Sequence, residues 1–167
     1  MVHMEWLGAV QDYLVWDAMW VAGVIVGMLL FAYTLGRYAM VPLFSAMVTS
    51  ALLAQFVPYI DRVPFLATYA DYQQRVIVFF VLLVLLFVLY RKNRFFEPCV
   101  VPSGWELGVF AVVYAGFLLA ILSSFLPTEM VADLSLHVRL VFADEFPRMF
   151  WLLSPFFLFT LLHGNVD

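Results

Sequence analysis

VIVFFVLLVLLFVLY, residues Val76–Tyr90, is the most hydrophobic stretch of the chain and decides its fold. A helix needs about 20 mostly apolar residues to cross the roughly 30 Å of bilayer hydrocarbon. The run reaches that length if residues 72–75 form its first turn, with the Arg75 side chain extending outward to the lipid headgroups. The stretch therefore predicts a membrane-spanning helix over residues 73–90.

The composition of the whole chain agrees with a membrane location. Of 167 residues, 66% are hydrophobic and 12% are charged, whereas a soluble domain is about 45–50% apolar and about 25% charged. A soluble chain of this length has too little interior to bury so much apolar surface. The net charge of −4 argues against a nucleic-acid partner and against a polybasic lipid-binding surface. Membrane lipids are the expected surroundings.

Four more apolar segments predict spanning helices, over residues 18–35, 39–57, 105–126 and 146–163. The last is the weakest, because its apolar centre is short and Pro155 lies in the middle of it. It is interpreted as a kinked spanning helix, with a buried or re-entrant segment as the alternative. The sequence thus predicts one all-α domain over residues 1–167, a polytopic membrane bundle of four to five transmembrane helices.

Two further segments have the pattern of amphipathic helices that lie in the membrane interface. Residues 4–15 place tryptophan, valine, tyrosine and leucine near one face, opposite two acidic residues. In residues 128–143, four apolar side chains recur at helical spacing: Met130, Leu134, Val138 and Val141. These segments predict an N-terminal and an outer-loop interfacial helix.

The charged residues near the span ends predict an orientation. Arg91, Lys92 and Arg94 form the densest positive cluster of the chain. Arg37 lies on the same side of the membrane, because two spans separate its loop from theirs. Because cytoplasmic loops are enriched in Lys and Arg, we expect this side to face the cytoplasm. The N-terminus then lies outside, and the C-terminus lies inside if there are five spans. Arg37 and Asp17 are interpreted as interface residues, or alternatively as a buried arginine and an ion-pair partner.

Small residues mark two candidate helix-packing sites. Gly23 and Gly27 form a GxxxG motif in the first span, and a second small-residue stripe runs along the fourth: Ala111, Ala115, Gly116 and Ala120. Small side chains let helix backbones approach closely in lipid. We expect packing within the chain, with contact between copies of the chain as the alternative.

The second span carries the polar side chains. Ser45 and Thr49 share a helix face, Gln55 follows, and Pro42 precedes them. Such a stripe indicates hydrogen bonding between helices, or alternatively the lining of a transport path beside a proline-broken helix. No charged residue lies in the middle of any span, which argues against an active transporter.

The chain carries no motif of a known catalytic chemistry. It has neither a Gly-x-Ser-x-Gly nor a His-Glu-x-x-His pattern, no phosphate-binding glycine loop, and a single cysteine. The three histidines have no ligand-like partner at helical spacing. We therefore predict no enzyme activity, no cofactor and no metal.

Three features mark the first two spans: Trp16-Asp17 before the first span, Leu35-Gly36-Arg37 at the turn, and Pro58 after the second span. In these features the two spans resemble the opening hairpin of CvpA-type proteins, which are small bacterial inner-membrane proteins named for colicin V production. Tyr38 stands where the family has a second glycine. The resemblance implies a bacterial-type inner-membrane location and a role in secretion or envelope maintenance, and it implies no catalytic residue.

Taken together, these features predict a structural or assembly subunit. Its partners are expected to be copies of itself or other membrane proteins, in a homo-oligomer or an envelope- or secretion-related complex. The alternative is a passive channel or small-solute transporter, with the second span lining the path.

Overall fold

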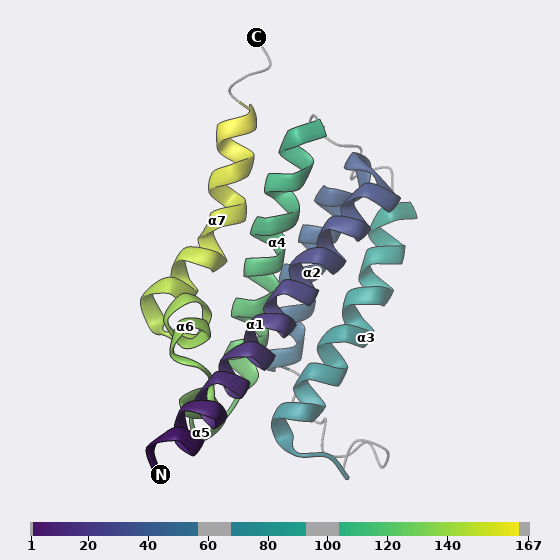
Figure 1. The fold of residues 1–167 in the computed structure, drawn as a ribbon. Coiled ribbons are helices and arrows are strands. Elements are labelled where there is room, and N and C mark those ends of the chain that lie inside the picture. Colours follow the sequence, from purple (N-terminus) through teal and green to yellow (C-terminus); the bar gives the residue numbers. More distant parts are fainter. Residues whose placement is uncertain (1, 57–67, 93–103, 164–167) are drawn as a thin grey trace.

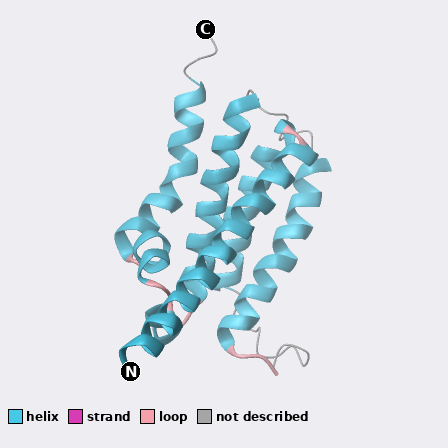
Figure 2. Cartoon of the chain, viewed as in Figure 1, coloured by secondary structure: helices cyan, strands magenta, loops and turns pink. Residues whose placement is uncertain are grey.

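The computed structural model describes residues 2–56, 68–92 and 104–163; side chains are described for 18–36, 38–56, 68–92, 104–158 and 160. Within these ranges the chain is helical apart from short connections (Figure 2). The elements are α1 (Val2–Leu35), η1 (Arg37–Ala39), α2 (Met40–Phe56), α3 (Asp71–Lys92), α4 (Gly104–Phe125), α5 (Thr128–Asp133), α6 (Leu136–Val138), the π-helical η4 (Arg139–Ala143) and α7 (Glu145–His163).

Helix α4 is the centre of the bundle. Helices α1, α2, α3 and α7 all contact it, and α2 also packs along α3 (Figure 1). As a result 61% of the α4 segment is buried, against 6% of Ala18–Leu35 in α1 and 11% of α3. Most residues of Ala18–Leu35 and of α3 are therefore partly or fully exposed.

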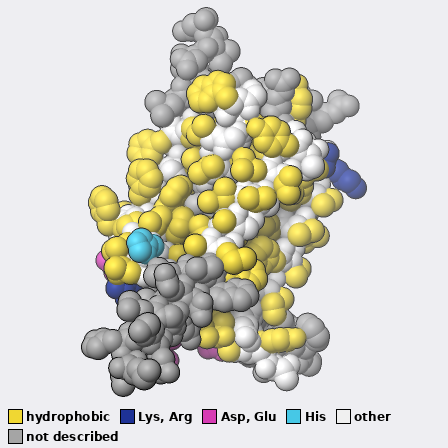
Figure 3. All heavy atoms as spheres, viewed as in Figure 1, with side chains coloured by type: hydrophobic (Ala, Val, Ile, Leu, Met, Phe, Trp, Pro, Cys, Tyr) yellow, Lys and Arg dark blue, Asp and Glu magenta, His cyan; other side chains and the backbone are white. Residues whose placement is uncertain are grey.

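The chain is an all-α membrane bundle, and its exposed apolar surface is the part that contacts lipid. A broad belt of hydrophobic side chains covers the face in Figure 3, and charged atoms lie at its edges. Three helical segments are long and apolar enough to cross a bilayer: Ala18–Leu35, Asp71–Lys92 and Gly104–Phe125. Helix α2 is apolar but has 17 described residues, which cover about 26 Å at about 1.5 Å per residue.

The turn between the first two spans lies where the sequence predicts it. Gly36 has a φ of +78°, a left-handed conformation that glycine adopts without steric cost. Its amide donates to the Ala32 carbonyl at 3.0 Å, which caps the end of α1. Chain reversal then continues through η1 into α2.

Helix α1 differs from the prediction of a separate N-terminal interfacial helix. It runs without interruption for 34 residues, or about 51 Å, and crosses the bundle obliquely (Figure 1). The physical reason is that residues 2–35 contain no proline and no turn sequence that could end a helix. The side chains of the predicted interfacial face lie outside those described.

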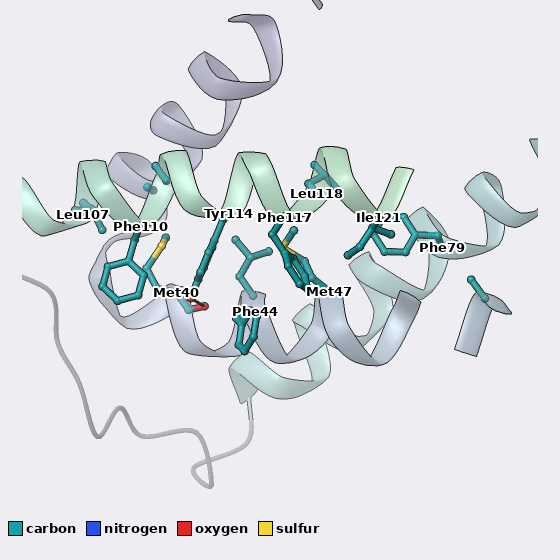
Figure 4. Packing of buried hydrophobic residues seen from close by; sticks show 14 of the residues in the cluster. Met40, Phe44, Met47, Phe79, Leu107, Phe110, Tyr114, Phe117, Leu118 and Ile121 are labelled. Carbon is teal, nitrogen blue, oxygen red and sulfur yellow. Dashed lines mark hydrogen bonds between the residues drawn. The ribbon is translucent and has the colours of Figure 1, made fainter. Parts of the chain in front are cut away.

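The core lies between α2 and α4. Met40, Phe44 and Met47 of α2 point toward Tyr114 and Phe117 of α4 (Figure 4). The Tyr114 hydroxyl donates to the Met40 carbonyl at 3.1 Å. Phe44 also meets α7, because its ring centroid lies 5.1 Å from that of Phe156 in an edge-to-face arrangement.

The predicted single helix over residues 128–143 is wrong. The chain is extended at Leu134 and at Ser135, with ψ values of 149° and 145°, so α5 ends there and a new helical segment starts. Phe142 is buried at 8% exposure, whereas Met130 and Val141 of the predicted apolar face are exposed. The break changes the helix direction, which lets Phe142 rather than Val141 face the bundle.

Helix α7 corresponds to the predicted fifth segment, and Pro155 lies inside it. Proline has no amide to donate to the carbonyl four residues earlier, that of Trp151. The Ser154 hydroxyl donates to that carbonyl at 2.9 Å. The neighbouring serine thus satisfies the group that the proline would leave unpaired.

Candidate functional site

The two glycines of the GxxxG motif lie on the exposed side of α1. In the described part of the chain, no atom apart from the adjacent backbone of α1 lies within 4 Å of a β-carbon at Gly23 or Gly27. The expectation that this pair packs within the chain is therefore wrong, because the opposite side of α1, with Val24 and Met28, faces the core. Met19 and Leu30 share the outward side with the glycines and are 61% and 62% exposed.

The small residues of α4 lie inside the bundle. Ala111, Ala115 and Ala120 are at most 1% exposed, and Gly116 is buried beneath the Trp151 ring of α7. A β-carbon at Gly116 would overlap atoms of that ring. The absence of a side chain at Gly116 thus allows α4 and α7 to pack closely at this position.

Trp151 and Ser123 hold the end of η4, and no motif in the sequence marks either residue. The Trp151 Nε1 donates to the Val141 carbonyl at 2.8 Å, and the Ser123 hydroxyl lies 3.0 Å from the Phe142 carbonyl. The last carbonyls of a helical segment have no partner within it, and an unpaired one costs several kcal/mol in lipid. Side chains of α7 and α4 therefore satisfy the end of η4.

The predicted polar stripe of α2 faces protein for part of its length. The Thr49 hydroxyl donates to the Ser45 carbonyl at 2.8 Å and accepts from the Tyr90 hydroxyl of α3 at 3.3 Å. Gln55 is exposed near the end of the helix. Pro42 lies in the first turn, where amides have no helical partner in any case, so α2 continues past it without the break that the alternative interpretation requires.

The predicted interface charges are described only in part. Arg91 and Lys92 are exposed in the last turn of α3, at the end of the bundle that also holds the α1–η1 turn and the start of α4 (Figure 1). Asp17 and Arg37 have described backbones, but their side chains lie outside the described set. Arg94 lies outside the described residues altogether.

No polar cluster typical of an active site or metal site stands out in the described ranges, where no three His, Cys, Asp or Glu side chains gather. The most distinctive surface is the outward side of α1, defined by Met19, Gly23, Gly27 and Leu30 and called here the glycine face. Comparison of the chain with protein-family models, curated proteins and solved structures gave no match.

Proposed function

We propose that the protein is a non-enzymatic structural subunit that associates with copies of itself through the glycine face of α1. The observation that carries the proposal is the exposure of Gly23 and Gly27: within the described residues, nothing beyond the adjacent backbone of α1 lies within 4 Å of a β-carbon at either position. Association of helices in lipid depends on close packing more than on the hydrophobic effect. Two glycines one turn apart offer a shallow groove for such packing.

The position of α1 in the bundle supports this proposal. Its opposite side already packs on α4 through residues such as Val24 and Met28. The glycine face is therefore available without any rearrangement of the bundle. Met19 lies one turn before Gly23 and Leu30 lies one turn after Gly27, so a second copy would meet small residues with larger ones on either side.

The alternative function is a passive channel or small-solute transporter along α2. The hydrogen bonds of Thr49 to Ser45 and Tyr90 favour the structural proposal, since they engage the stripe in contacts within the protein. Ser45→Cys and Thr49→Cys, each in a Cys99→Ser background, should react slowly with a membrane-impermeant thiol reagent. Gln55→Cys is the exposed comparison. Fast labelling at positions 45 and 49 would favour the channel.

The test of self-association is the native mass in a lipid nanodisc, where one chain contributes 19.2 kDa. We expect an oligomer that Gly23→Ile or Gly27→Ile dissociates, because a branched side chain separates the helix backbones. Gly108→Ile is the matched control, since Gly108 on α4 also has open space around it. A wild-type monomer, or an oligomer that both α1 variants leave intact, would contradict the proposal.

The proposal includes a location and a topology. We assign the protein to a bacterial-type inner membrane, with the Arg91 and Lys92 end of the bundle in the cytoplasm and the N-terminus outside. The excess of Lys and Arg beside cytoplasmic span ends supports this orientation. An envelope- or secretion-related complex remains the proposed setting for the oligomer.

A further inference from the structure

A cavity of about 290 Å³ lies between α1, α4 and the segment that runs from α5 to η4. Its walls include Val24 of α1, Leu122 of α4, and Val138 and Ala143 of the following segment. The cavity thus touches three parts of the chain that are far apart in the sequence.

The lining of this cavity is apolar. Among the described lining residues, polar side-chain groups are limited to the Ser123 hydroxyl and the Trp20 indole N–H. The Ser123 proton is committed to the carbonyls of Ala120 and Phe142, at 2.9 and 3.0 Å. An ordered water needs two to four polar partners. The described side chains offer at most two partners, the Ser123 oxygen and the Trp20 indole, and the other lining residues are apolar. The cavity therefore favours an apolar occupant over water.

The size and the position of the cavity indicate what that occupant is. A cavity of about 150 Å³ with apolar walls binds benzene, so twice that volume holds roughly a dozen carbon atoms on the same scale. Trp20 contributes to the lining and is 71% exposed, so one wall of the cavity reaches the outer surface of α1. That surface belongs to the hydrophobic belt, which faces lipid in a membrane.

We propose that this cavity binds the end of one hydrocarbon chain of a membrane lipid. The chain enters past Trp20 and lies against Val24, Leu122 and Val138. It fills space between α1 and the α5–η4 segment, whose main contacts are with other parts of the bundle. A lipid tail thereby acts as a packing element that the polypeptide itself does not supply.

The test uses photo-crosslinking of the full chain in nanodiscs. The probe is a phosphatidylethanolamine that carries a diazirine near the end of one acyl chain. We expect labelling to concentrate in peptides that contain residues 119–126 and 134–143, above the labelling of the exposed α3 residues Val81 and Val84. Labelling of the cavity peptides at or below the level of α3 would mean ordinary contact with bulk lipid and would overturn the proposal.

Two variants fill the cavity from different walls, so that a folding defect in one still leaves a test. Ala143→Leu and Val24→Phe should each reduce labelling of the cavity peptides several-fold. Each variant should still show a cooperative thermal unfolding transition, which demonstrates that it is folded. Ala132→Leu, at an exposed position of α5, is the matched control and should label as the wild type does. Unchanged labelling in a folded Ala143→Leu or Val24→Phe protein would overturn the proposal. These results do not depend on the glycine face, because labelling is read for each chain regardless of oligomeric state.

Discussion

Gly116→Ala is the smallest substitution that tests the packing of α7 on α4. The added β-carbon would overlap the Trp151 ring. If the ring stays, the site is overpacked, which costs about 1–3 kcal/mol. If the ring moves away, it loses the hydrogen bond to the Val141 carbonyl, worth about 0.5–1.5 kcal/mol. It also loses the stacking on Phe142, of a similar magnitude. Relative to a glycine-to-alanine change at an open position of the same helix, both routes give a loss of about 1–3 kcal/mol in the free energy of unfolding.

The assay is unfolding by sodium dodecyl sulfate in mixed micelles, followed by tryptophan fluorescence. Gly108→Ala is the matched control on the same helix, because nothing lies within 4 Å of a β-carbon there. It should be neutral or slightly stabilising, since alanine is the better helix former by about 0.8–1.0 kcal/mol.

A double-mutant cycle isolates the contact between the two residues. In a Trp151→Ala background the ring is absent, so Gly116→Ala should cost almost nothing. The reasoning fails if Gly116→Ala is as stable as Gly108→Ala, or if its cost persists without the tryptophan.

Three more predictions concern backbone carbonyls and topology. Ser123→Ala should destabilise by about 1–3 kcal/mol because it leaves the Phe142 carbonyl unpaired; Ser124→Ala, whose hydroxyl bonds within its own helix, should cost far less in the same unfolding assay. Ser154→Ala should cost about 1 kcal/mol beside Pro155 but little in a Pro155→Ala background, where the restored amide can bond the Trp151 carbonyl; equal costs in both backgrounds would contradict this account. Lys92→Cys in a cysteine-free chain should resist an impermeant thiol reagent in intact bacterial cells and react after lysis; labelling of intact cells would reverse the proposed orientation.

Hydropathy was sufficient to locate the long helices, because lipid demands about 20 apolar residues wherever a helix crosses it. The turn at Gly36 was also predictable, since a left-handed residue after a helix favours glycine. The break at Leu134–Ser135 was not. Helical periodicity runs through it, and the bonds that hold the following segment come from Ser123 and Trp151, which lie on helices distant in the sequence.

The sequence predicts the GxxxG motif of the glycine face but not that this face is exposed. The sequence shows that Gly23 and Gly27 share a face, but both sides of α1 are apolar, so composition does not tell the side that packs from the side that faces lipid. Trp151 was missed for a related reason. The chain is 19% aromatic, and the residues next to Trp151 in the sequence do not distinguish it from the aromatic residues that face lipid.

The central position of α4 has a consequence for biosynthesis. A chain is made from its N-terminus, and α1 finds its main partner only when α4 has been made, after α2 and α3 have paired with each other. Until then the inward side of α1, with Val24 and Met28, meets lipid or the insertion machinery. The α2–α3 hairpin is therefore the first tertiary unit to form, and the arrival of α4 joins α1 to it.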